Sequence, residues 1–224
     1  MGHYDSARLM GKLISGNRLT TLITSLTVSF SSDDHPVNFI PIGREVFAQT
    51  NHNLILRDIK FTLKGEAYVS QKISTEVVMS KIDEALSLYD TLHPKVGYFF
   101  NLAMQESDIL KQFIYYFLVI EIYTHQTFKK LDYIASISQL NNIPQRIESS
   151  VTEFFIDRQM ESKNLSQRFI WCAILKWHEI SDADITQFKN IKKFRDRIFH
   201  GEEVVESALP VGYAKQLALK LLKS

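Results

Sequence analysis

Hydrophobic and polar residues alternate along the first third of the chain with the two-residue period of a half-buried β-strand. The clearest case is the stretch 22–30, where every second residue from Leu22 to Phe30 is apolar or threonine. Further short strands, separated by proline, glycine and polar residues, are predicted at 37–42, 45–49, 59–63 and 67–69. Together these strands predict a small antiparallel sheet, so we expect residues 1–73 to form a β-rich N-terminal region.

From residue 74 onward the hydrophobic residues recur every three or four positions, as they do on one face of a helix. Ser74 or Thr75 can cap the first helix, and Ser107 can cap a long helix at 108–131. The long helix is apolar on almost every side, so we expect it at the centre of a helical bundle. Further helices are predicted at 147–160, 164–180, 182–200 and 213–222. The sequence thus predicts an α+β fold, with a helical bundle at 74–224 after the β-rich region.

The 224 residues are 45% hydrophobic and 23% charged, which is the composition of an ordinary globular protein. A net charge of +1 means that the chain as a whole does not attract nucleic acid. Cys172 is the single cysteine, so it has no disulfide partner within the chain, and its apolar neighbours predict that it is buried. The longest apolar run, 113–123, is interrupted by Glu121 and is too short to cross a bilayer. We expect a cytoplasmic protein without membrane association.

The predicted helix at 182–200 has the most distinctive chemistry of the chain. Between positions 189 and 197 five cations accompany one carboxylate, a net charge of +4, from Lys189, Lys192, Lys193, Arg195, Arg197 and Asp196. A solvated helix face would explain this charge. Attraction to the phosphate backbone of RNA would explain it equally well.

The spacing of residues near the end of this helix suggests a reactive site. Asp196 and His200 are one helical turn apart, so the carboxylate could orient or charge the imidazole. Arg195 and His200 are about 140° apart around the helix. They would converge if the helix unwinds at His200, which Gly201 permits, or if the same helix of a second copy approaches. An arginine that holds a phosphate and a histidine that moves a proton suffice for RNA cleavage without a metal.

These residues resemble a known family. Residues 195–201, Arg-Asp-x-x-x-His-Gly, follow an apolar and basic run at 188–194 and resemble the Arg-(polar)-x-x-x-His signature of HEPN domains, the higher eukaryote and prokaryote nucleotide-binding fold. The stretch 106–121 is similar to the opening helix of many such domains, and 209–222 is similar to their closing helix. The resemblance covers roughly residues 97–222.

The resemblance implies a small helical bundle that forms a homodimer, with the arginine and histidine pairs lining a cleft between protomers. Many such proteins resemble metal-independent endoribonucleases of toxin or defence systems, with an antitoxin or a defence complex as partner. In this chain Arg195 would hold the scissile phosphate and His200 would transfer a proton, with Asp196 tuning the pKa of the imidazole. RNA would be cleaved to a 2′,3′-cyclic phosphate without a cofactor or metal. The RNA backbone would be bound by Lys189, Lys192, Lys193 and Arg197.

A non-catalytic protein is the alternative, because other HEPN-like proteins only bind RNA, dimerise or act as scaffolds. In that case Arg195 and Asp196 form a structural ion pair and His200 ends the helix. Glu121 bears on this choice, since it could pair with His125 or form a buried ion pair with an arginine of the basic helix. The two hypotheses differ in whether Arg195 and His200 face solvent in one shared concave surface.

Overall fold

The computed structural model of the chain describes residues 18–32, 37–39, 44–49, 55–60, 74–132, 146 and 148–224. The chain divides into two compact units, Met1–Tyr98 and Phe99–Ser224. The division falls inside α3 (Pro94–Gln105). The domain boundary that we predicted at residues 73 and 74 remains a prediction, and each unit is described separately below.

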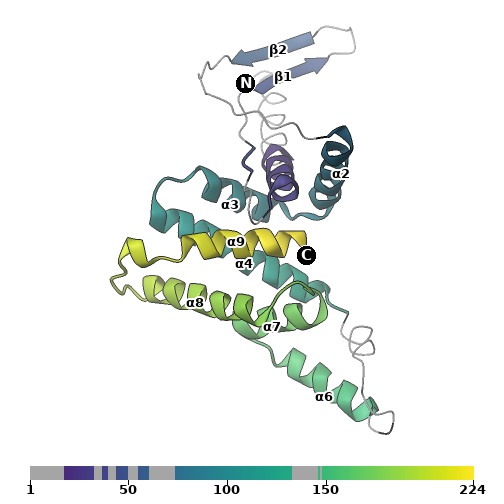
Figure 1. Cartoon of the computed structure of the whole chain (residues 1–224), viewed down its shortest axis with the longest axis vertical. Coiled ribbons are helices and arrows are strands. Elements are labelled where there is room, and N and C mark those ends of the chain that lie inside the picture. The colour runs from purple at the N-terminus through teal and green to yellow at the C-terminus, as the bar shows by residue number, and fades with distance from the viewer. Residues whose placement is uncertain are drawn as a thin grey trace, which may run out of the picture. The chain divides into compact units, whose positions relative to one another are not determined.

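The α+β class predicted for this chain is wrong, because the described residues are predominantly helical (Figure 1). The stretch 22–30, which was the clearest predicted strand, lies in a helix that spans residues 18–30. Strands β1 (Arg44–Gln49) and β2 (Ile55–Lys60) pair antiparallel as a hairpin, with Arg44 opposite Lys60. This is the one strand pairing in the described residues, and it is too small to define a β region.

The other strand predictions have mixed outcomes. The strand predicted at 45–49 coincides with β1, and the one predicted at 59–63 overlaps the end of β2. Residues 37–39 are not in a strand. The strand predicted at 67–69 lies outside the described residues.

Small side chains form the buried face of the helix at 18–30. Thr21, Thr24, Ser25 and Val28 follow the spacing of one helical face, and all four are at most 5% exposed. Two of these side chains donate to backbone carbonyls: Ser25 to that of Thr21 (3.0 Å), and Thr24 to that of Gly97 in α3 (3.0 Å). The helices approach so closely that a Cβ on Gly97 would lie 3.1 Å from the Thr21 Cα.

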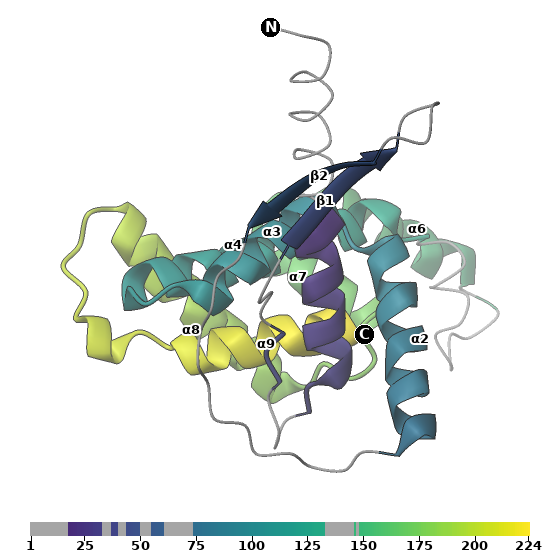
Figure 2. The same ribbon diagram turned by 90° about the horizontal axis from the view of Figure 1, so that it is seen from above.

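The second helix of this unit is α2 (Thr75–Thr91), and it lies beside the helix at 18–30 in both views of the molecule (Figure 1, Figure 2). Ser74 caps it, as predicted, by accepting a hydrogen bond from the backbone N–H of Val77 (3.4 Å). Ala85 is its one buried residue, while Val77, Met79 and Leu86 are about half exposed.

The second unit is built around α4 (Ile109–Lys130), which contacts α7 (Leu165–Leu175), α8 (Asp182–Phe199) and α9 (Val211–Lys223). The prediction of a central helix is therefore confirmed. Its cap is Asp108, rather than Ser107 as predicted, because the Asp108 carboxylate accepts from the backbone N–H of Lys111 (2.9 Å). The buried residues of α4 are Phe113, Tyr116, Phe117, Val119, Ile120 and Thr124.

Aromatic rings fill the space between α4, α7 and α8. The Tyr123 and Trp177 rings stack with centroids 6.0 Å apart, and Phe169 meets Trp177 edge-on at 5.2 Å. Phe188 of α8 then stacks on Phe169 at 3.9 Å. This cluster fixes the side of α8 that faces the core, and so determines which residues of α8 face solvent.

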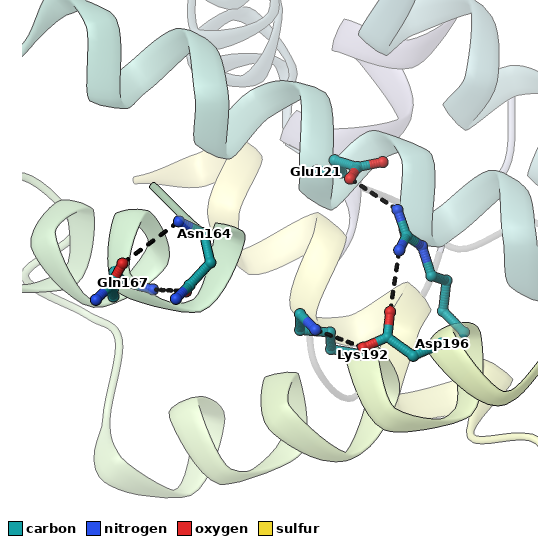
Figure 3. Close-up of polar contacts among 6 residues, drawn as sticks. Glu121, Asn164, Gln167, Lys192 and Asp196 are labelled. Atoms are coloured by element: carbon teal, nitrogen blue, oxygen red, sulfur yellow. Dashed lines mark hydrogen bonds and ion pairs between the residues drawn. The ribbon is translucent and has the colours of Figure 1, made fainter. Parts of the chain in front are cut away.

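Two further elements complete the unit. Helix α6 (Glu148–Met160) has no residue in its described part that is buried, and a short 3-10 turn, η2 (Glu206–Ala208), precedes α9. Helix α7 begins with a capping box, in which the side chains of Asn164 and Gln167 each accept from the other's backbone N–H (Figure 3). Within the described segments, no helix combines the length and the apolar character needed to cross a membrane.

Candidate functional site

Helix α8 begins at a capping box that also ties it to α9. Ser181 is the cap, and its hydroxyl accepts from the backbone N–H of Asp184 (3.4 Å). The Asp184 carboxylate accepts in return from the backbone N–H of Ser181 and from Lys220 of α9, both at 2.7 Å. Burial would raise the pKa of Asp184, but the hydrogen bonds from Lys220 and Ser181 outweigh it and lower that pKa.

Helix α8 ends in a Schellman turn at Gly201, whose φ of +75° is the left-handed conformation. The backbone N–H of Glu202 donates to the carbonyl of Arg197, and that of Gly201 donates to Ile198, both at 3.0 Å. The Arg197 guanidinium then donates to the Glu202 carboxylate (2.7 Å). Gly201 therefore stops the helix at His200, as its position in the sequence predicted.

Two sides of α8 have different environments. Phe188 and Ile191 are fully buried on the side that faces the core, and Arg195 follows them at helical spacing. Lys189, Lys193 and His200 are exposed on the other side. The turn at Gly201 does not rotate His200 back toward the core, so the arginine and histidine of the predicted site lie on different sides of the helix.

The guanidinium of Arg195 is bound within its own protomer (Figure 3). It donates to Glu121 of α4 and to Asp196, each at 3.0 Å, and its carbon lies 4.8 Å from the ring centroids of both Phe117 and Phe199. Its Nε is buried without a hydrogen-bond partner. The ion pair between Glu121 and an arginine of this helix, which we had considered from the sequence, is thus present. Arg195 joins α8 to α4, and each of its two terminal nitrogens donates to a carboxylate.

Asp196 is also bound to cations. Its carboxylate accepts from Lys192 and from Arg195, and Figure 3 shows Lys192 and Asp196 on neighbouring turns. Burial would raise the pKa of Asp196, but these two partners outweigh it and lower that pKa. Within the described residues the His200 ring has no hydrogen-bond partner, and the contact predicted between Asp196 and the imidazole is not formed.

An open pocket of about 350 Å³ lies on the exposed side of α8. Its lining residues are Ser166, Lys189, Lys192, Lys193, Asp196, Arg197, His200 and Glu202. All four cations that we predicted to bind RNA are among them, together with His200, while Arg195 is not. With four cations and two carboxylates, the pocket has a net charge of +2 when His200 is neutral. In the described part of the chain, Lys189 and Lys193 have no acidic partner.

Some of these residues could not be identified from the sequence. Ser166 comes from the start of α7, more than twenty positions before the basic run, and no pattern in the sequence connects the two. Glu202 follows the helix, and its pairing with Arg197 depends on the geometry of the Schellman turn. By contrast, three residues of the exposed side have helical spacing and could be predicted, namely Lys189, Lys193 and His200.

Within the described residues, three other kinds of chemistry would depend on His125, on a cluster of metal-ligating side chains, or on Cys172. Arg168 donates a hydrogen bond to Nδ1 of His125 (3.0 Å), and burial followed by the charge of Arg168 lowers the pKa of the imidazole. The described residues contain no group of three His, Cys, Asp or Glu side chains that could hold a metal ion. Cys172 is buried as predicted, and burial raises the pKa of its thiol to about 12, which leaves it protonated and unreactive.

Comparison of the chain with protein-family models, with curated proteins and with solved structures gives no match. The resemblance to HEPN domains therefore rests on the residues quoted above. The helical bundle agrees with one expectation from that resemblance, while ribonuclease activity, a homodimer and a toxin or defence role remain predictions.

Proposed function

We propose that this protein binds the phosphate backbone of RNA along the exposed side of α8. The observation that supports this proposal is the pocket that gathers Lys189, Lys192, Lys193, Arg197 and His200 on one side of one helix. Lys192 and Arg197 are partly neutralised by carboxylates, but Lys189 and Lys193 are exposed cations without an acidic partner in the described residues. We therefore expect the ligand to place negative charge near Lys189 and Lys193.

The dimensions of the cationic side suit a polyanion. From Lys189 to His200 the helix rises about 16 Å, which is long enough to follow several successive phosphates of one strand. Ammonium groups on flexible stems bind phosphate oxygens without reading sequence, so affinity should depend strongly on salt and weakly on sequence. Because the net charge of the chain is only +1, this local patch would have to supply the attraction.

Cleavage through Arg195 and His200 is less well supported by the geometry. A phosphate held by Arg195 would have to approach a guanidinium that already pairs with Glu121 and Asp196, and both carboxylates would repel it. One observation nevertheless favours cleavage as a second candidate function, since Arg197 and His200 line the same pocket. A guanidinium and an imidazole could face one phosphate there if Arg197 left Glu202.

The binding proposal can be tested with a charge-reversal pair. Fluorescence anisotropy with a labelled single-stranded RNA should show that Lys189→Glu with Lys193→Glu lowers the affinity at least about tenfold and reduces the salt slope by about 1 to 2. Lys129→Glu with Lys130→Glu, two exposed lysines at the end of α4, makes the same change in net charge and serves as the control. An equal loss in both variants, or no binding by the unaltered protein, would contradict the proposal.

The same RNA, incubated with chelator and separated on a gel, tests the second candidate. Fragments that end in a 2′,3′-cyclic phosphate, and that disappear in His200→Ala, would establish cleavage in addition to binding. RNA that binds but stays intact would support binding without cleavage.

A further inference from the structure

Phe199 is an exposed aromatic residue in the last turn of α8. It immediately precedes His200 and is 65% exposed. Single exposed apolar residues are common on protein surfaces, so exposure alone has no functional meaning. Two further observations distinguish Phe199, namely its support by Arg195 and its position directly before His200, which lines the cationic pocket.

Arg195 holds the Phe199 ring from one side. The guanidinium carbon lies 4.8 Å from the ring centroid, and the guanidinium is itself fixed by Glu121 and Asp196. Because the residue is 65% exposed, much of the ring remains open to solvent. A ring that is already held in place loses less side-chain entropy when a ligand packs against it.

The ring also adjoins the residues that would bind phosphate. Phe199 lies one turn beyond Asp196, and it is about 100° around the helix from His200. Asp196 and His200 both line the pocket, whereas Phe199 is not among the lining residues, so the ring lies next to pocket residues along the helix and on a neighbouring side of it. An RNA strand whose phosphates follow the lysines would bring its bases toward this end of the helix.

We propose that an unpaired RNA base stacks on the open face of Phe199 while the neighbouring phosphates contact the cationic side of α8. This inference rests on the proposed function, and it specifies the kind of RNA that is bound. Bases of a duplex are stacked on one another and paired, so their faces are closed to a protein ring. The site should therefore favour single-stranded over double-stranded RNA.

The experiment compares two matched aromatic residues. Phe199→Leu removes the aromatic face but keeps an apolar side chain, and Phe154→Leu is the control. Phe154 on α6 is 54% exposed and is also backed by an arginine, with the Arg158 guanidinium carbon 5.3 Å from its ring centroid. Each variant is titrated by anisotropy with a single strand of about 16 nucleotides and with the duplex of the same sequence.

We expect Phe199→Leu to weaken binding of the single strand roughly 5-fold to 100-fold, the range that loss of one stacked base gives, and to leave duplex binding unchanged. Phe199→Tyr should keep the affinity because it keeps the ring. Phe154→Leu should have no effect on either RNA. If Phe199→Leu has no effect, or weakens both RNAs equally, the stacking inference is wrong even where the lysine variants show that the binding proposal is correct. If no RNA binds the unaltered protein, both are wrong.

Discussion

The guanidinium of Arg195 has two carboxylates at hydrogen-bond distance and two phenyl rings beside it. A phosphate would have to compete with these two carboxylates for the same cation, and both would repel it. Removing one partner of a pair that is largely withdrawn from solvent leaves the other charge poorly compensated. At the scale of the residue, Arg195 is therefore expected to affect stability more than ligand binding.

Glu121→Gln tests this expectation. The side chains of Glu121 and Arg195 are 21% and 26% exposed, so loss of the charged partner should lower the free energy of unfolding by about 1 to 3 kcal/mol. Urea unfolding measures the difference. Glu84→Gln is the control, because its pair with Lys81 is well exposed and should contribute less than about 1 kcal/mol. Equal effects of the two substitutions would show that Arg195 does not depend on Glu121.

The lowered pKa of Asp196 predicts how its contribution changes with pH. A carboxylate whose folded pKa lies below its unfolded value of about 3.9 stabilises the protein fully above that value. The stabilisation is lost as the pH falls through the folded pKa. The difference in unfolding free energy between the unaltered protein and Asp196→Asn should therefore be largest near neutral pH and shrink below about pH 4.

Asp184→Asn should show the same trend, because the pKa of Asp184 is also lowered. Urea unfolding at a series of pH values measures both. A difference that grows on acidification would mean that the contacts of Asp196 with Lys192 and Arg195 do not stabilise its charged form.

The end of α8 shows how one glycine determines where an element stops. The Schellman turn requires the left-handed conformation of Gly201, and this conformation places Glu202 where Arg197 can bind it. Any other residue at position 201 would adopt this backbone at a cost.

Gly201→Ala should accordingly lower the free energy of unfolding by about 1 kcal/mol, since a side chain with a Cβ is strained at positive φ. Gly212→Ala is the matched control. Gly212 lies in α9, has no atom within 4 Å of an added Cβ and has no positive φ, so alanine there should be neutral or slightly stabilising. Thermal unfolding measures both variants. Midpoints that moved in the same direction would contradict this account.

At the scale of elements, most helices from 74 onward could be predicted because their apolar residues recur at helical spacing, whereas α3 (Pro94–Gln105) was not predicted. The helix at 18–30 could not be predicted in this way. Its buried positions include Thr24 and Ser25, and the alternating pattern placed these two neighbours on opposite faces, with Ser25 on the polar one. Their hydroxyls donate to backbone carbonyls, so they are buried without penalty and the true helical period is hidden. The apolar residues that remain visible happen to alternate.

The candidate site was predictable in part, for a related reason. Spacing along one helix places Lys189, Lys193 and His200 on one side, and that side is now seen to line a pocket. The role of Arg195 depends on Glu121, which is 74 positions away in the sequence. A spacing rule cannot decide whether a polar side chain faces solvent or a distant carboxylate, because that depends on how the helices pack.

At the scale of the whole molecule, a homodimer remains a prediction. It was expected because a second copy could bring Arg195 and His200 together, but Arg195 is already bound by Glu121 of its own protomer. Sedimentation should give about twice the 25.9 kDa chain mass if a dimer forms. A monomer would remove the composite cleavage site, while binding of RNA along α8 would be unaffected because every residue of the pocket belongs to one chain.

The aromatic cluster has a consequence for spectroscopy. The chain has two tryptophans, Trp171 and Trp177, and both lie in the unit Phe99–Ser224. Intrinsic tryptophan fluorescence therefore reports on that unit alone, whereas far-ultraviolet circular dichroism reports on helices of both units. The helix at 18–30 buries hydroxyl-bearing side chains, whose transfer from water yields less free energy than that of the aromatic rings. During urea titration the dichroism signal should begin to fall before the fluorescence changes, and coincident curves would mean that the two units unfold as one.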